Sequence, residues 1–412
     1  MLFNSYEFIF AFLPITLFVF IFISRIDSEK AIAWLVIASL FFYGWWNPNY
    51  LILIITSMVI NYTIGFFINN FYSRKKTAKY LLIFGILFNL SLLGYYKYAN
   101  FFLENASFLL PTQFEIQQIL LPLAISFFTF QQIAFLVDAY KGITKEYKFL
   151  HYALFVTFFP QLIAGPIVHH KEMLPQFMNR HNIRLNVNNI TIGLAIFSIG
   201  LFKKAVLADG IAVYANPIFS MAEAGQQMGL FQSWGGALSY TLQLYFDFSG
   251  YSDMAIGSAR LFGIKLPLNF HSPYKALNIT EFWRRWHITL SRFLRDYIYI
   301  PLGGNRQGGL RRYINLFTTM LLGGLWHGAG WTFVIWGALH GLYLIINHFW
   351  QFIVQKFNLI FLQHSKLWKA FAWLLTFLAV IVGWVFFRAN NLDAAILLLE
   401  SMSGKHGISI PN

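Results

Sequence analysis

Two histidines in apolar surroundings are the residues of this sequence best suited to chemistry. His327 lies in the glycine-rich apolar stretch 320–341, and His287 lies 40 residues upstream in the amphipathic, arginine-rich run 281–296. An ionisable side chain among bilayer-compatible residues is costly, and it is therefore a functional-site candidate. Histidine also takes up and releases a proton near neutral pH. The pair predicts proton-transfer chemistry.

Acyl transfer to an alcohol is one reaction that such a histidine can catalyse. An alcohol becomes an effective nucleophile when a base within hydrogen-bond reach takes its proton. Transfer from a thioester then needs little more than an oriented acceptor and a dry channel. The spacing of the histidines is equally compatible with the proton relay of a transporter.

The sequence lacks the residues and motifs that most other catalytic and binding sites require. The chain contains no cysteine, which excludes disulfides and thiolate nucleophiles. His-x-x-x-His and His-Glu-x-x-His motifs are missing, so no metal site is expected, and neither a Walker A loop nor a dinucleotide fingerprint occurs. Gly250–Met254 resembles a nucleophile elbow only superficially, because the second glycine is missing.

The composition indicates an integral membrane protein. Of the 412 residues, 58% are hydrophobic and 11% are charged, whereas soluble domains carry roughly 25% charged residues. The net charge of +14 is spread over short loops between apolar runs. Such spacing is typical of positive-inside signals and contacts with anionic membrane lipids, and we expect no nucleic-acid partner.

The apolar runs predict an all-α polytopic fold in one transmembrane domain, residues 1–412. A spanning helix needs about 20 apolar residues. Eleven candidate spans, several of them short, are Phe8–Ser24, Ala31–Trp46, Tyr50–Ile68, Tyr80–Tyr96, Ile119–Val137, Leu150–Ile167, Ile190–Leu207, Trp234–Phe248, Tyr313–Trp326, Trp331–Phe349 and Trp368–Phe387. We expect broken or re-entrant helices around Pro122, Pro160–Pro166 and Gly323–Gly330, because irregular backbone at membrane depth survives only inside protein or beside a cavity.

The loop charges predict an orientation. The loop at 74–79 is strongly basic, whereas the next, 99–118, contains Glu104 and Glu115 but no lysine or arginine. This alternation predicts a multi-pass protein with its N-terminus outside and its basic loops in the cytoplasm. The run 281–296 then predicts one helix lying in the cytoplasmic headgroup plane, with His287 on its apolar side. A histidine merely packed in an interface explains that position equally well.

Several ordered motifs resemble one family. They are Phe158-Phe-Pro-Gln-Leu-Ile-Ala-Gly-Pro166, Gln243-Leu-Tyr-Phe-Asp-Phe-Ser-Gly-Tyr-Ser-Asp-Met254, Glu281-Phe-Trp-Arg-Arg-Trp-His-Ile-Thr-Leu-Ser291, Leu294-Arg-Asp-Tyr-Ile-Tyr-Ile-Pro-Leu-Gly-Gly-Asn-Arg306 and Leu322-Gly-Gly-Leu-Trp-His-Gly328. Together they are similar to the bacterial membrane-bound O-acyltransferases, in the alginate O-acetyltransferase branch. The resemblance covers essentially the whole chain.

The resemblance implies a bundle of about 10–12 transmembrane helices, with re-entrant and interfacial helices, around a tunnel in the bacterial inner membrane. The family's near-invariant histidine corresponds to His327, the expected general base, and a second family position corresponds to His287. Four further residues are candidates to line the tunnel, although a structural role is the more common explanation for each: Asp253, Asn269, Trp286 and Trp326.

The resemblance also implies the partners. The acyl donor is acetyl-CoA from the cytoplasm, and no cofactor is permanently bound. The acceptor is a hydroxyl of an extracytoplasmic polysaccharide such as alginate, reached directly or through a periplasmic acetyltransferase partner. Members of this branch commonly continue with further helices after 380–388, so we expect either a short member or one that lacks C-terminal helices.

Two other functions stay open at this point. A transporter or flippase for a lipid-linked sugar would use the histidines in a proton relay, although the inverted repeats of many transporters are not apparent here. A noncatalytic scaffold of a secretion complex would depend on the arginines Arg284, Arg285 and Arg292 and not on His327. The sequence also leaves the acceptor open among alginate, other exopolysaccharides, peptidoglycan and teichoic acid.

Overall fold

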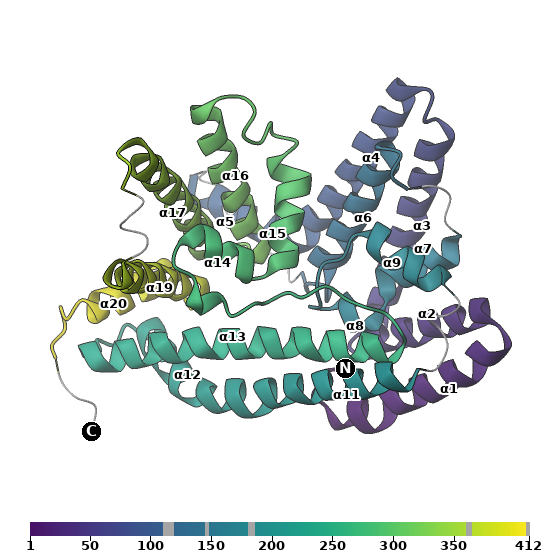
Figure 1. The fold of residues 1–412 in the computed structure, drawn as a ribbon, viewed down its shortest axis with the longest axis horizontal. Coiled ribbons are helices and arrows are strands. Elements are labelled where there is room, and N and C mark those ends of the chain that lie inside the picture. The colour runs from purple at the N-terminus through teal and green to yellow at the C-terminus, as the bar shows by residue number, and fades with distance from the viewer. Residues whose placement is uncertain (110–118, 145–147, 180–185, 360–364, 409–412) are drawn as a thin grey trace. The chain divides into compact units, whose positions relative to one another are not determined.

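The computed structural model describes residues 1–109, 119–144, 148–179, 186–359 and 365–408 (Figure 1). All regular secondary structure within those residues is helical, which confirms the predicted all-α fold. The chain forms two compact units. The first comprises Met1–Phe202 and Gly250–Pro267, and the second comprises Lys203–Ser249 and Leu268–Asn412. Helix α13, Leu230–Leu261, begins in the second unit and ends in the first.

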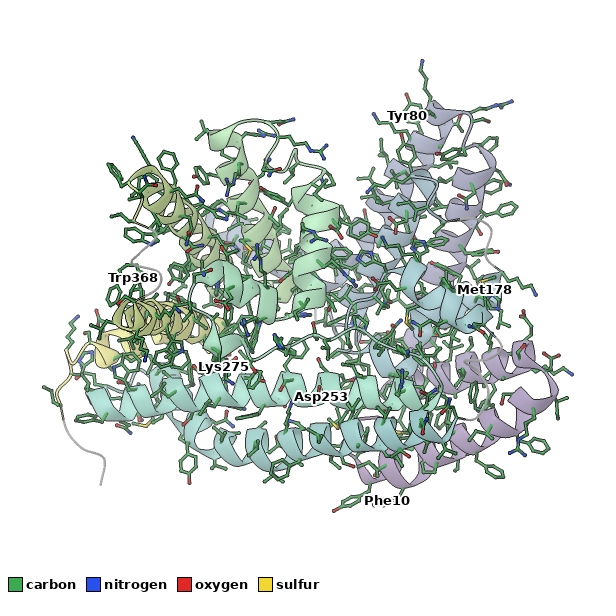
Figure 2. The ribbon with its side chains drawn as sticks, in the orientation of Figure 1. Phe10, Tyr80, Met178, Asp253, Lys275 and Trp368 are labelled. Carbon is green, nitrogen blue, oxygen red and sulfur yellow. The ribbon has the colours of Figure 1, made fainter. Side chains whose placement is uncertain are left out.

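Six apolar helices within the described residues identify a multi-pass membrane protein. The helices that are long and apolar enough to cross a bilayer are Phe8–Ile26, Asn49–Asn70, Lys75–Ser107, Val187–Glu223, Trp331–Lys356 and Lys366–Arg388. Large apolar side chains cover much of their outer surface. Phe10 and Tyr80 are 72% exposed and point away from their helices (Figure 2). Such exposure is unfavourable in water but suits hydrocarbon.

Helices begin or end at the three places where proline and glycine predict breaks in the sequence. The run 150–167 is no single span, because α7, Phe149–Thr157, ends before α8, Phe159–Leu162. In a continuous helix the ring of Pro160 would clash with the carbonyl of Val156. Helix α6, Ile125–Tyr140, begins only after Pro122. Helices α16, Gly309–His327, and α17, Trp331–Lys356, are separated by three residues that include Gly328 and Gly330.

The first unit is built from many helices around a phenylalanine-rich core. Its further elements are η1 (Phe8–Phe12), α1 (Leu13–Ile26), α2 (Ser28–Gly44), α3 (Asn49–Asn70), α4 (Lys75–Leu93), η2 (Gly94–Tyr98), α5 (Ala99–Leu109), α9 (His170–Met178) and α11 (Val187–Phe202). The rings of Phe12 and Phe159 meet edge to face with centroids 5.1 Å apart, and Phe42 packs against both. These contacts join α2 and α8 to the N-terminal segment.

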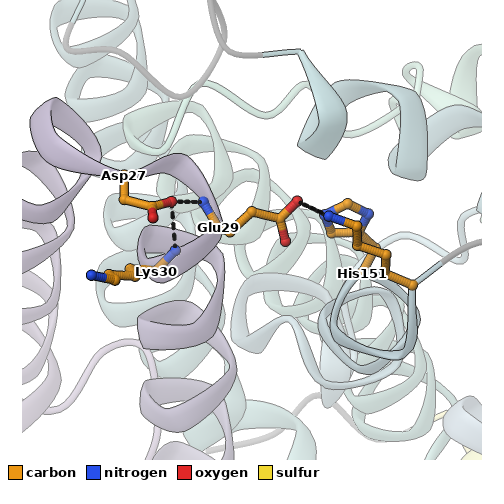
Figure 3. A network of polar contacts seen from close by, with 5 residues as sticks. Asp27, Glu29, Lys30 and His151 are labelled. Atoms are coloured by element: carbon orange, nitrogen blue, oxygen red, sulfur yellow. Dashed lines mark hydrogen bonds and ion pairs between the residues drawn. The ribbon is translucent and has the colours of Figure 1, made fainter.

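Polar contacts fix the start of α2. The carboxylate of Asp27 accepts hydrogen bonds from the backbone N–H groups of Glu29, at 2.8 Å, and Lys30, at 3.3 Å (Figure 3). It thereby satisfies two of the free donors at a helix N-terminus. The carboxylate of Glu29 lies 2.9 Å from the ammonium of Lys148 and 3.5 Å from Nε2 of His151. These contacts connect α2 to α7.

A buried polar network links three helices of the first unit. Asn61 on α3 exchanges side-chain hydrogen bonds with Asn89 on α4 and donates to Gln132 on α6. Ser57 donates to the same oxygen of Gln132 at 2.8 Å. All four side chains are buried. Because an unpaired amide in hydrocarbon is costly, this network favours one arrangement of the three helices.

The second unit contains the two histidines of the sequence analysis. Its further elements are η3 (Lys203–Ala208), α12 (Asp209–Glu223), η4 (Pro273–Lys275), α14 (Ile279–Arg285), α15 (Ile288–Leu294), η5 (Arg295–Tyr299), α19 (Lys366–Arg388) and α20 (Leu392–Met402). Helices α16 and α17 lie side by side and antiparallel (Figure 1). At their crossing a Cβ on Gly324 would come within 2.3 Å of the carbonyl oxygen of Phe333, and a Cβ on Gly337 within 2.6 Å of that of Met320. Only glycine permits this close approach.

We predict that Asn61→Leu destabilises the protein by about 1–3 kcal/mol, because it removes several interhelical hydrogen bonds worth about 0.6–1.7 kcal/mol each in membrane proteins. Thermal unfolding of the purified protein in detergent measures the change. Asn70→Leu is the matched control, since Asn70 is exposed at the end of the same helix. Equal stabilities of the two variants would contradict a structural role for the network.

Candidate active site

His287 lies at a break between two short helices, where the sequence predicts one continuous helix over 281–296. Helix α14 ends at Arg285 and α15 begins at Ile288. His287 has φ 41° and ψ 54°, in the left-handed region that non-glycine residues seldom adopt. The prediction of one continuous helix over 281–296 is therefore wrong, although its placement of His287 away from water is consistent with the 1% exposure of this residue.

The preceding segment supplies the physical reason for the break. The backbone N–H of Ile288 donates to the carbonyl of Asn269, and the carbonyl of Arg285 accepts from the N–H of His271, both at 2.9 Å. In a continuous helix those groups would bond to residues four positions away. The N–H of Thr289 donates instead to the side-chain oxygen of Asn269 at 3.3 Å. Three backbone groups at the break thus have partners in the segment 269–271.

The same side chain defines the tautomer of His287. Oδ1 of Asn269 lies 3.0 Å from Nδ1 of His287 and also accepts from the N–H and the hydroxyl of Thr289. A backbone N–H can only donate, so this atom of Asn269 is the oxygen and Nδ1 of His287 carries a proton. Nε2 of His287 therefore holds the lone pair, and it has no hydrogen-bond partner among the described residues.

His287 is uncharged at neutral pH. It lies outside the six apolar helices that can cross the bilayer. Burial lowers the pKa of its imidazole to about 3, because the charged form would lose its hydration. A neutral imidazole with one fixed N–H and one free lone pair can accept a proton or a hydrogen bond at Nε2.

His327 is the last residue of α16, half-buried in a group of aromatic rings. The rings of Trp326, Trp336 and Phe387 lie with centroids 4.8, 5.0 and 5.0 Å from its imidazole. The carbonyl end of a helix favours a nearby positive charge. A proton taken up by His327 during a reaction is therefore stabilised by its position at the helix end.

Trp326 lies against both histidines. Its ring centroid is 6.2 Å from that of His287 and 4.8 Å from that of His327. Trp286, next to His287 in the chain, packs against Phe270 at 5.0 Å and Trp384 at 4.7 Å. The structure thus brings five of the six sequence candidates into one aromatic cluster of the second unit: Asn269, Trp286, His287, Trp326 and His327.

Asp253, the sixth candidate, belongs to the other compact unit. It lies half-buried on the part of α13 that belongs to the first unit (Figure 2). Helix α11 passes close by, since a Cβ on Gly200 would come within 3.0 Å of Cβ of Asp253. Its observed surroundings are those of a helix–helix contact.

His340, which the sequence motifs did not indicate, is a further member of the cluster. It is fully buried, and its ring centroid lies 4.8 Å from that of Trp336, which also contacts His327. On one continuous helix His327 and His340 would lie on roughly opposite sides. The break at 328–330 removes that separation, because α17 folds back along α16. An ionisable residue within an apolar span was a signal that could have identified it.

Charged side chains lie on the exposed side of α14 and α15. Arg284 and Arg295 are exposed, and Arg285 pairs with Glu281 at 2.8 Å, one helical turn earlier. Arg295 pairs with the adjacent Asp296 at 2.7 Å. Throughout the described part of the chain, no three His, Asp or Glu side chains are grouped as metal ligands. The cluster is thus an arrangement of histidines and aromatic rings beside a basic surface.

Comparison with known proteins places this site in a family context. Residues 42–386 match the model of the membrane-bound O-acyltransferase family. The chain is 49% identical to the peptidoglycan O-acetyltransferase of Helicobacter pylori, an alignment that covers 100% of this chain and 81% of the relative. It is 42% identical to the "Probable alginate O-acetylase AlgI" of Pseudomonas aeruginosa, over 98% of this chain and 75% of the relative. A teichoic acid D-alanyltransferase of Streptococcus thermophilus is 29% identical, over 67% of this chain and 70% of the relative.

We predict that His287 makes the protein less stable in acid. The unfolded histidine titrates near 6.5, whereas burial lowers the pKa of folded His287 to about 3. The unfolded state therefore binds more protons between these values, and stability falls as the pH decreases through this range. Between pH 7 and pH 5 the loss is on the order of 2 kcal/mol.

Thermal unfolding in detergent at the two pH values tests this. His287→Gln should show a smaller loss of stability on acidification than the unmodified protein. His271→Gln is the control, because His271 lies exposed in the same segment and uses only its backbone in hydrogen bonds. If His287→Gln and the unmodified protein respond to pH identically, His287 is not a buried neutral group.

Proposed function

The chain belongs to the membrane-bound O-acyltransferase family, and from this premise we propose that it transfers acetyl from acetyl-CoA to a hydroxyl of an extracytoplasmic polysaccharide. His327 is the general base. The observation that carries this assignment is the position of His327: half-buried at the end of α16, between three aromatic rings, and one tryptophan away from a second histidine.

In the proposed reaction His327 first takes up a proton and then returns it. The acceptor oxygen attacks the thioester carbonyl carbon while its proton passes to the imidazole of His327. The carbon–sulfur bond then breaks, and the leaving thiolate of CoA takes the proton back from the imidazolium. The carbonyl end of α16 stabilises the imidazolium between these steps. The aromatic rings exclude water, which would otherwise compete for the acetyl group.

His287 orients a reactant. Its Nδ1–H is engaged with Asn269, so Nε2 accepts a hydrogen bond from the reactant that lies beside Trp326. Trp286 and Trp326 form walls of the same cluster. The donor approaches His287 from the cytoplasmic side, where the exposed Arg284 supplies a positive charge for the phosphates of CoA.

The acceptor that the comparisons favour is peptidoglycan. The peptidoglycan O-acetyltransferase shares 49% identity with this chain, and the alginate relatives share 41–42%. Alginate is the second candidate, because several relatives named for it align with nearly the whole chain. In either case a periplasmic acetyltransferase is a candidate partner that carries the acetyl group to the polymer.

We predict that His327→Ala lowers acetyl transfer by about 100- to 10,000-fold, the range that a general base contributes. The measurement is acceptor-dependent release of CoA from acetyl-CoA by the purified protein. His348→Ala serves as the control, because His348 lies on α17 outside the aromatic contacts of His327. Unchanged CoA release by His327→Ala would exclude the proposed base.

We predict that deletion of the gene removes O-acetyl groups from peptidoglycan. Mass spectrometry of muropeptides and of surface polysaccharide, from cells with and without the protein, measures both candidate acceptors at once. Reintroduction of the unmodified gene should restore acetylation, and reintroduction of the His327→Ala gene should not. Loss of acetyl from alginate with unaltered muropeptides would transfer the assignment to alginate.

A further inference from the structure

A cavity of about 640 Å³ lies in the second unit between α17, α19 and the residues that lead into α14. This volume is within the range of about 300–1,000 Å³ that ligand pockets occupy. The lining is mainly apolar and includes a few amides and one lysine. Its aromatic and charged lining includes Tyr343, Trp350, Trp368 and Lys369.

One end of the cavity carries the features of a membrane–water interface. The rings of Trp350 and Trp368 stack with centroids 5.3 Å apart, and both line the cavity together with Lys369. Figure 2 shows Trp368 near the start of α19. Tryptophan and lysine gather at the headgroup level of membrane proteins. Because α17 and α19 are both long enough to span the bilayer, the cavity opens between two membrane helices at that level.

The charged residues that α17 and α19 contribute to this end are all basic. Helix α17 ends at Lys356 and α19 begins at Lys366, and neither helix contains an aspartate or a glutamate. Lys369 is exposed and forms no ion pair with any residue that the structure describes. A basic pocket between membrane helices is suited to an anionic lipid headgroup.

The rest of the cavity is suited to hydrocarbon. From Lys369 the lining continues along α19 through Leu375 to Ala379, a rise of about 15 Å at 1.5 Å per residue. Ile346 and Tyr343 form the facing wall on α17. Tyr343 in turn lies 5.7 Å, centroid to centroid, from His340. The apolar end of the cavity therefore adjoins the aromatic cluster.

We propose that this cavity binds one anionic phospholipid, with its phosphate at Lys369 and an acyl chain along Ile346, Leu375 and Ala379. The site is separate from the proposed acetyl-transfer site and does not depend on that function. The lipid fills apolar volume between α17 and α19 and thereby supports the helices that carry Trp336 and Phe387 beside His327.

Native mass spectrometry of the full chain in detergent tests the proposal. After delipidation, the protein is titrated with phosphatidylglycerol or with phosphatidylcholine. We expect one tightly retained phosphatidylglycerol and weaker retention of phosphatidylcholine. Ala372→Trp, which places a large ring in the cavity, should lower phosphatidylglycerol retention at least tenfold. Ala370→Trp adds the same ring two residues away, at an exposed position outside the lining, and should retain the lipid.

A second pair of variants, one of them the control, tests the contact between the lipid headgroup and Lys369. Lys369→Gln should reduce phosphatidylglycerol retention to that of phosphatidylcholine, and Lys366→Gln, outside the lining, should not. Size-exclusion chromatography confirms that each variant is folded and monodisperse. Equal retention by the two tryptophan variants would overturn the cavity as the lipid site. A preference for phosphatidylglycerol that survives Lys369→Gln would overturn the role of Lys369.

Discussion

The hydrogen bond from Nδ1 of His287 to the side-chain oxygen of Asn269 is the contact on which the geometry of the site depends. The segment around Asn269 takes up the backbone groups that the break between α14 and α15 releases, and this allows His287 to adopt a left-handed conformation. The same oxygen accepts from Thr289 and leaves the lone pair of His287 on Nε2. Burial keeps the imidazole neutral. Asn269 thus contributes through its backbone to the path of the chain at His287 and through its side chain to the tautomer of the histidine.

The second determinant is the glycine-rich turn after His327. It ends α16 at the histidine and lets α17 return along α16, where Gly324 and Gly337 allow the backbones to approach closely. The return places Trp336 against both His327 and His340. Small residues at helix contacts are a general feature of membrane proteins, where packing replaces the hydrophobic effect as the source of stability. Here the close packing also builds the aromatic surroundings of the proposed base.

Much of this organisation could be predicted from the sequence, and the reasons for the failures are physical. Apolar runs, prolines and glycines act locally, so the helical class and the breaks at Pro122, Pro160 and Gly328 followed from them. The break at His287 did not, because its backbone partners lie at Asn269 and His271, residues that no helical periodicity connects to it. His340 was missed for a similar reason. Its closeness to His327, through Trp336, depends on how α16 and α17 pack after the turn at 328–330, and local sequence patterns do not show this packing.

The central claim is that His327 removes the proton of the attacking hydroxyl, and chemical rescue tests it most directly. His327→Gly leaves space for a small base at the end of α16 without changing the other residues of the cluster. Acceptor-dependent CoA release by this variant should be very slow and should rise in proportion to added imidazole, while the unmodified protein does not respond. Substantial release by His327→Gly in the absence of imidazole would show that the proton is taken elsewhere and would contradict the account.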